Sequence, residues 1–363
     1  MVDHKKPSFR VRLASLFSLK VLRSLVIFVT SLWLFILGIT LMKEGARELG
    51  PIIQDVFSIG SPSSSLGFGW LFAYATMSGS PVAAASLTFF DAGIISDLGA
   101  FTMITGSRLG ASLIVLLIGF VYMLRGRGRR ESLGIGVLSL IVTATTYGAA
   151  LGVGFAFLQT GFLDGVQVGG APWVSSVVNG FFYPIVDPLT QHLPGWLVFV
   201  IGLLVILFSL RLFDFFLPTV SLRESRFGRV SRLVYRPVVM LLMGALITLV
   251  SMSVSVSISI LVPLSNRGFV RRENIIPYIM GANITTFIDT LLAAVLLQNP
   301  RAFTVVLVEM TSVAVVSAVI LLFFFRRYER TILALVDKLV HNNLNLALFI
   351  AVIFTIPLLL VLL

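Results

Sequence analysis

Long runs of apolar residues alternate with short polar segments along most of this chain. A helix needs roughly 20 consecutive, mainly apolar residues to cross the hydrocarbon layer of a bilayer, which is about 30 Å thick. Seven runs are long enough, and they predict membrane-spanning helices near 24–42, 102–124, 134–158, 196–217, 275–297, 302–325 and 344–363. The pattern therefore predicts an all-α polytopic membrane protein.

Two further apolar regions are interrupted near their middle, so that each piece is too short to span a bilayer alone. Region 66–95 is interrupted by Ser78-Gly79-Ser80-Pro81, and region 237–264 by an alternation of serine and aliphatic residues at 251–259. Broken apolar regions of this kind are typical of re-entrant helical hairpins, in which the break lies near the middle of the membrane.

The serine alternation allows two interpretations. A spacing of two residues places the hydroxyls of an extended backbone on one face, whereas it scatters them around a helix. Extended backbone survives at this depth only beside a cavity or inside protein, so the serines are expected to line a site. The alternative is that they are small helix-interface residues that hydrogen-bond back to their own helix.

Most of the 27 Lys and Arg residues fall in five segments, which are 1–23, 125–131, 222–236, 265–273 and 326–338. If the N-terminus is cytoplasmic, the seven spans alternate and the two broken regions each enter and leave on the same side, all five segments face the cytoplasm, as the positive-inside rule requires. The longest opposite loop, 159–195, contains no Lys or Arg. Topology thus explains the net charge of +11 without nucleic-acid binding, and we expect a multi-pass protein of the plasma membrane with a cytoplasmic N-terminus.

The first hairpin region has a counterpart in the second half of the chain, at an offset that aligns Met252-Ser253-Val254-Ser255 with Met77-Ser78-Gly79-Ser80. This repeat offset also aligns Ile279-Met280-Gly281 with Ile104-Thr105-Gly106. Three full spans separate the two hairpins, and because this number is odd, the second copy enters from the opposite side of the membrane. We therefore predict two inverted-topology repeats, at 24–130 and 218–325, joined by connecting spans at 131–217 and followed by a basic segment and last span at 326–363.

The segment Gly281-Ala282-Asn283-Ile284-Thr285-Thr286 resembles a motif of the type II sodium/phosphate cotransporters, Gly-Ala-Asn-Ile-Gly-Thr-Thr, which follows a Gln-Ser-Ser-Ser hairpin motif in each repeat of that family. Its counterpart in the first half is Gly106-Ser107-Arg108-Leu109-Gly110-Ala111-Ser112. Leu34-Phe35-Ile36-Leu37-Gly38 and Asp91-Ala92-Gly93-Ile94-Ile95-Ser96 add to the resemblance, which covers roughly residues 30–325.

This resemblance implies a site for phosphate at the interface of the two repeats, with sodium as the coupling ion and no other cofactor. Its motifs fall on nine residues of this chain, which become the candidate substrate-binding residues: Ser78, Gly79, Ser80, Arg108, Ser253, Ser255, Asn283, Thr285 and Thr286.

The coupling ion is less well defined, because Met77 and Met252 stand where the family has glutamine. Glutamine offers amide and carbonyl groups, whereas a thioether is a poor ligand for a hard cation such as sodium. The candidate ion-coupling residues are therefore these two methionines together with Asp289 and Glu309, whose carboxylates could bind protons if sodium is not used. The alternative for each carboxylate is a hydrogen bond to Ser or Thr of a neighbouring helix.

Arg108 replaces the asparagine of the first motif and brings a fixed cation with five hydrogen-bond donors to membrane depth. Our hypothesis is that Arg108 binds an anionic substrate directly, or that its charge replaces a lost sodium ion. The alternative is a buried salt bridge with Asp91 or Asp289. Asp91 and Asp97 are expected in solvated positions near the outer end of the first hairpin.

Three classes of function remain. The first is a secondary anion transporter that works by alternating access, with phosphate as the substrate by resemblance or another small anion coupled to protons. The second is a transporter-like protein that binds a ligand or partner without transport. The third is an intramembrane enzyme, which we rank last because no His or Lys accompanies the serines at depth.

The absence of cysteine and the positions of the three histidines in polar segments lead us to expect no catalytic residues and no metal site. The expected partners are a small inorganic anion, phosphate by resemblance, and the lipid bilayer, while nucleic acid is excluded and a homodimer is left open.

Overall fold

The computed structural model describes residues 19–57, 60–124, 129–166, 168, 172–216, 236–259, 261, 265 and 270–363. Within these residues every regular element is a helix: α2 (Leu19–Phe57), α3 (Pro62–Thr76), α4 (Ser80–Asp91), α5 (Asp97–Ala111), α6 (Leu113–Leu124), α7 (Arg129–Thr160), α8 (Pro172–Val177), α9 (Tyr183–His192), α10 (Gly195–Phe216), α12 (Pro237–Ser251), α13 (Val254–Ser259), α15 (Arg272–Thr285), α16 (Ile288–Leu296), α17 (Pro300–Val319), α18 (Phe325–His341) and α19 (Asn343–Leu362), with π-helical segments η1 (Val178–Phe182) and η3 (Ile320–Phe324).

Parts of several predictions lie outside the described residues. They concern the basic segments at 1–18, 125–128, 222–235 and 266–269, and the end of the second hairpin region at 262–264. Ser255 belongs to α13, but its side chain is also outside the described part of the chain.

Seven described helical segments are long and apolar enough to cross a membrane: Leu22–Gly50, Asp97–Leu124, Leu133–Thr160, Gly195–Phe213, Arg272–Leu296, Pro300–His341 and Asn343–Leu362. Each overlaps one of the seven predicted spans, so the prediction of an all-helical, multi-span membrane protein is confirmed by length and composition. Two of these segments are interrupted, between α5 and α6 at Ser112 and between α15 and α16 at Thr286 and Phe287.

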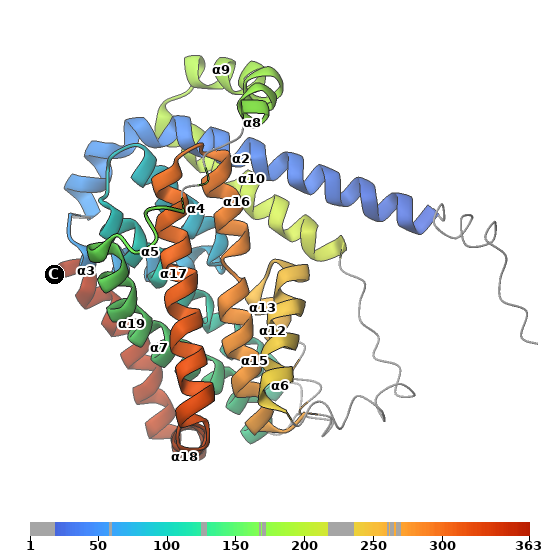
Figure 1. The fold of residues 1–363 in the computed structure, drawn as a ribbon, viewed down its shortest axis with the longest axis vertical. Helices are drawn as coiled ribbons and strands as arrows, with labels where there is room; N and C mark the ends of the chain where they lie inside the picture. The colour runs from blue at the N-terminus through green and yellow to red at the C-terminus, as the bar shows by residue number, and fades with distance from the viewer. Residues whose placement is uncertain are drawn as a thin grey trace, which may run out of the picture.

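The helices form a bundle, and one pair, α2 and α10, crosses part of it (Figure 1). α2 and α10 pack side by side in that pair, and a side chain at Gly38 of α2 would collide with the backbone of Gly202 in α10. α15 and α17 run lengthwise through the bundle, while α8 and α9 lie at one end of it and α18 lies at the other. Small residues thus allow close helix contacts, as is common in membrane proteins.

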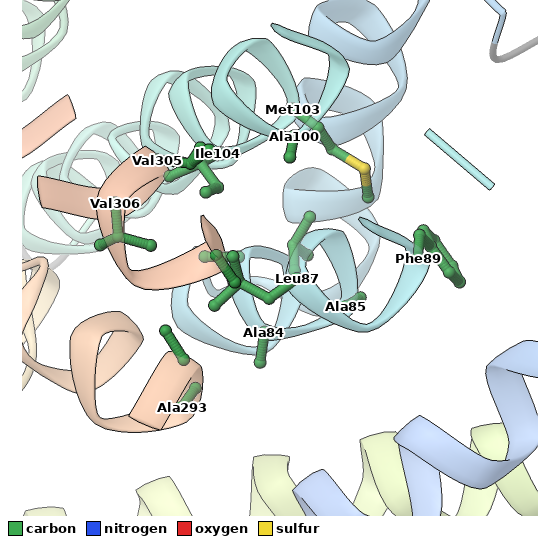
Figure 2. Packing of buried hydrophobic residues seen from close by; sticks show 14 of the residues in the cluster. Ala84, Ala85, Leu87, Phe89, Ala100, Met103, Ile104, Ala293, Val305 and Val306 are labelled. Carbon is green, nitrogen blue, oxygen red and sulfur yellow. The ribbon is translucent and has the colours of Figure 1, made fainter. Parts of the chain in front are cut away.

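The largest core cluster surrounds α4, a helix so poor in exposed surface that nine of its residues are buried. Figure 2 shows Ala84 and Leu87 of α4 packed among side chains of α5, α16 and α17. On another side Phe89 stacks on Phe199 of α10, with the ring centroids 5.1 Å apart. α4 therefore contacts helices from both halves of the chain.

Two helix pairs have the same close packing at positions related by the repeat offset. A β-carbon at Gly69 of α3 would collide with the carbonyl oxygen of Met103 in α5, and one at Gly244 of α12 would collide with that of Tyr278 in α15. In the reverse direction, Gly106 faces the carbonyl oxygen of Leu66, just as Gly281 faces that of Leu241. At the same offset, both ends of α12 coincide with those of α3, and the start of α15 coincides with that of α5.

The serine alternation at 251–259 is helical except at the break, so the interpretation as small helix-interface residues fits the backbone and the interpretation as extended backbone does not. Only Met252 and Ser253 interrupt the helices, and α13 includes the remaining serines. The hydroxyl of Ser257 lies 2.8 Å from that of Tyr278, which also donates to the Ser257 carbonyl oxygen. Because serine hydroxyls can be satisfied inside a helical bundle in this way, their spacing does not require a strand.

Candidate functional site

Two helix breaks with the same backbone conformation lie at the centre of the candidate site. The residue that follows α3 is Met77 with φ 51°, and the residue that follows α12 is Met252, also with φ 51°. Each break is closed by a hydroxyl that donates to the carbonyl oxygen two residues later, from Thr76 to Ser78 at 2.9 Å and from Ser251 to Ser253 at 3.1 Å. The left-handed conformation is unfavourable for a residue with a side chain, so both breaks hold some strain.

The two breaks meet at a small cavity of about 30 Å³. Seven of the nine candidate substrate-binding residues line it: Ser78, Gly79, Ser80, Arg108, Ser253, Asn283 and Thr286. Five further residues complete the lining: Ala111, Ser112, Thr143, Tyr147 and Val254. Its volume exceeds the roughly 10–15 Å³ that one water molecule requires, and the polar lining suits water or a small polar ligand.

The remaining predicted residues with described side chains lie elsewhere. The hydroxyl of Thr285 donates to the carbonyl oxygen of Ala245 in α12 at 2.9 Å, away from the cavity lining. Met77 is 44% exposed and Met252 is partly buried against the main core cluster, and neither lines the cavity. Each methionine contributes its backbone to a helix break, while its sulfur lies outside the cavity lining.

Arg108 is the charged group of the cavity, and it is only 5% exposed. Its Nη2 lies 3.2 Å from Oδ1 of Asp289 and donates to the hydroxyl of Thr290 at 2.6 Å. Its Nη1 donates to the hydroxyl of Ser80 at 3.2 Å, and the guanidinium carbon lies 5.1 Å from the ring centroid of Phe287. Arg108 therefore connects the start of α4 to α16 through its guanidinium group.

Asp289 is the ion-pair partner that the sequence left undecided between two aspartates. It is 2% exposed, and its Oδ1 also accepts a hydrogen bond from Thr290 at 2.8 Å. Its Oδ2 and the Nε of Arg108 are buried without a hydrogen-bond partner among the described residues. The pair thus retains one free acceptor and one free donor, and in a dry environment each has a strong tendency to bind a polar group.

Asn283 is held by α7. Its Nδ2 donates to the hydroxyl of Thr143 at 3.2 Å, and its backbone carbonyl oxygen accepts from the hydroxyl of Tyr147 at 3.1 Å. All three residues are buried. Sequence reasoning missed the two α7 residues because they lie outside the repeated motifs, although polar residues grouped within the apolar span 134–158 were a usable signal.

Glu309 on α17 is fully buried outside the cavity lining. Its Oε1 lies 2.7 Å from the hydroxyl of Thr105 on α5, and its Oε2 has no partner among the described residues. The expected alternative of a hydrogen bond to a neighbouring helix is therefore present. Thr105 and Arg108 are one helical turn apart on α5, so Glu309 meets the same face of the helix that carries the cavity arginine.

A second ionic group joins the ends of several helices away from the cavity. Lys43 of α2 lies 3.2 Å from Asp91 of α4, which also accepts a hydrogen bond from Asn299 at 2.9 Å. Arg301 of α17 pairs with Asp97 of α5 at 2.5 Å and with Asp164. Asp91 and Asp97 are partly exposed, with side chains 17% and 39% accessible, and each is also paired with a positive side chain of another helix.

Tyr183 of α9 extends these contacts along α2. Its hydroxyl donates to Oε1 of Glu44 at 2.9 Å. Burial, together with this carboxylate, raises the pKa of Tyr183 to about 12. The phenol therefore keeps its proton, and hence this hydrogen bond, at physiological pH.

The seven apolar spans around a buried polar cavity define a multi-span membrane protein. No family model, no curated protein and no solved structure matches this chain.

Proposed function

We propose that this protein is a secondary transporter of a small inorganic anion, with phosphate as the substrate by its resemblance to the type II sodium/phosphate cotransporters. One observation carries the proposal: the two helix breaks meet at the same polar cavity, which contains a buried fixed positive charge, Arg108. Broken helices that meet at a polar cavity inside an apolar bundle are the usual construction of substrate sites in secondary transporters.

The helices that the repeat offset relates support an origin in two inverted repeats. The helix bounds, the glycine contacts, the left-handed methionines and the hydroxyl-closed breaks all recur at the repeat offset. Three spans lie between the two breaks, so the halves would have opposite orientations in a membrane. We infer that α3 with α4, and α12 with α13, form the two re-entrant hairpins of these repeats.

An anion suits this cavity better than a cation. α4 begins at Ser80, and no side chain caps its N-terminus. Its second residue, Pro81, has no N–H, so Ser80 and Val82 carry the N–H groups of the first turn that have no intrahelical partner and could serve a ligand. A helix N-terminus favours negative charge, and a guanidinium group with neighbouring hydroxyls supplies directed donors for an oxyanion. Arg108 and the start of α4 thus provide complementary recognition of a phosphate-like group from the first half of the chain.

The basic segments support the membrane orientation. Arg326, Arg327 and Arg330 are exposed on α18, which lies at the opposite end of the bundle from α8 and α9 (Figure 1). With the positive end placed in the cytoplasm, the N-terminus is also cytoplasmic. As part of this proposal, the protein is assigned to the plasma membrane. Alternating access would follow from a rocking of one repeat against the other around the cavity.

The test is uptake of radiolabelled phosphate into proteoliposomes that contain the purified full-length protein, with and without an inward sodium gradient. Two variants separate the roles of Arg108. Arg108→Gln removes the cation but leaves Asp289 buried without its partner, whereas Arg108→Gln combined with Asp289→Asn removes both charges of the pair. We expect uptake by the natural protein and none by either variant, because an anion site requires the positive charge.

Two results would contradict this proposal. Uptake by the double variant at the level of the natural protein would reduce Arg108 to a structural partner of Asp289. Saturable phosphate binding by the natural protein without any uptake would replace transport by ligand binding alone.

A further inference from the structure

Glu309 and Thr105 form a hydrogen bond in which either group can be the donor. The hydroxyl oxygen of Thr105 lies 3.0 Å from the carbonyl oxygen of Phe101 and 2.7 Å from Oε1 of Glu309. A threonine hydroxyl has one hydrogen and can donate only once, although it can also accept. A carbonyl oxygen cannot donate, so if Thr105 donates to Phe101, the hydrogen of the shorter contact belongs to the carboxyl group of Glu309.

The surroundings of Glu309 also favour the protonated form of its carboxyl group. The side chain has no exposed surface, and no cation among the described residues lies within ion-pair distance of it. Its Oε2 has no hydrogen-bond donor either. An ionised carboxylate in such a place would bear a large desolvation cost with a single hydrogen bond to offset it, whereas a carboxylic acid would not.

Among the charged and titratable groups of the surrounding helices, Arg108 on α5 interacts with this carboxyl group, and both of them interact with Tyr147 on α7, as does Asp289 on α16. The positive charge of Arg108 is already paired with Asp289, which accepts from both Arg108 and Thr290. Asp289 is therefore the ionised carboxylate of the cluster. Arg108 and Asp289 together have no net charge. If Glu309 is a carboxylic acid, the three side chains together also have no net charge before an anion enters.

We propose that Glu309 is a proton-binding residue and that the proton is the coupling ion of the transporter. This inference rests on the proposed function. In one orientation a proton from water converts the Glu309 carboxylate into a carboxylic acid that donates to Thr105. In the other orientation the O–H bond breaks, the proton passes to water, and the carboxylate is hydrated. Because Thr105 and Arg108 share one face of α5, a shift of that helix against α17 affects the proton site and the anion site together.

The first measurement is infrared difference spectroscopy of the purified protein at neutral pH, which detects the carbonyl stretch of a protonated carboxyl group. We expect a carboxylic acid band that is lost in Glu309→Gln and retained in the matched control Asp187→Asn, since Asp187 is exposed on α9. Thr105→Val should shift this band to higher frequency, because the acid loses its hydrogen-bond acceptor. A spectrum without a band specific to Glu309 would overturn the assignment, whatever the transport activity.

The second measurement is phosphate uptake into proteoliposomes under an imposed pH gradient, acidic outside, without sodium. We expect accumulation by the natural protein and by Asp187→Asn. Glu309→Gln, which remains neutral and can still donate to Thr105, should lose accumulation but keep the exchange of external for internal phosphate. That retained exchange shows that the variant is folded and that the anion site works.

The outcomes separate the two claims. Exchange by the natural protein without any effect of the pH gradient, or full gradient-driven accumulation by Glu309→Gln, would refute proton coupling while leaving anion transport intact. If the natural protein shows neither exchange nor uptake, phosphate transport is refuted and proton coupling with it. The infrared band would still decide whether Glu309 holds a proton.

Discussion

Arg108 and Asn283 occupy places on α5 and α15 that the repeat offset makes equivalent, but they make different contacts. Arg108 contacts Asp289, Thr290 and Ser80, so its ion pair joins the first half of the chain to the second. Asn283 donates to Thr143 on α7, a helix outside the pairs that the repeat offset relates. The comparison teaches that helix positions related by the same offset can hold an asymmetric site, with the positive charge from one half of the chain and the balancing carboxylate from the other.

The largest expected difference between the two positions concerns stability. Arg108→Ala leaves the carboxylate of Asp289 buried without a cation, and loss of one partner of a buried pair costs about 3–5 kcal/mol. Asn283→Ala leaves only neutral groups unpaired, at a cost of about 1–3 kcal/mol. Thermal unfolding of the detergent-purified variants measures both, and equal losses would contradict the ionic asymmetry.

The glycine contacts should behave alike in the two halves. Gly106→Ala and Gly281→Ala each place a methyl group against a carbonyl oxygen of the paired helix, and overpacking of this kind typically costs about 1–3 kcal/mol. Gly148→Ala is the matched control, because a β-carbon there meets no atom within 4 Å. Unfolding temperatures that drop for only one of the two halves would argue against equivalent packing.

The two left-handed methionines should respond in the same direction but unequally. Met77→Gly removes a left-handed conformation that costs a residue with a β-carbon roughly 1–2 kcal/mol, and the exposed side chain contributes little packing, so the protein should become more stable. Met252→Gly should gain less, because Met252 also packs against the core. Met77→Ala keeps the β-carbon and should show no gain in the same unfolding assay.

The smallest expected effect tests the support for Asn283. Thr143→Val removes the acceptor of the Asn283 amide at nearly constant volume, and the loss of one such hydrogen bond costs about 1 kcal/mol. Thr160→Val provides the comparison, since that hydroxyl is exposed and bonds only within its own helix. A thermal shift no larger than in this control would show that α7 does not hold Asn283.

The sequence predicts the spans well because the length of an apolar run is dictated by the thickness of the bilayer. It also predicts most of the cavity lining, because the motif residues repeat at a fixed offset. It cannot choose between Asp91 and Asp289 as the partner of Arg108, since separation along the chain does not determine which helices touch. The contributions of Thr143 and Tyr147 depend on how α7 packs against α15, which no motif records.

Arg301 of α17 pairs with Asp97 at the start of α5 and with Asp164 after α7, and these groups are partly exposed. Any movement that separates the starts of α5 and α17 must break the contact with Asp97, and any movement of α17 away from the turn after α7 must break the contact with Asp164. Ion pairs open to solvent contribute only about 0–1 kcal/mol each and weaken further as dissolved ions screen them, within a Debye length of about 8 Å at physiological ionic strength. The ease of separating this end of the bundle should therefore depend on the salinity of the surroundings, whereas the dry pair of Arg108 and Asp289 should be nearly indifferent to it.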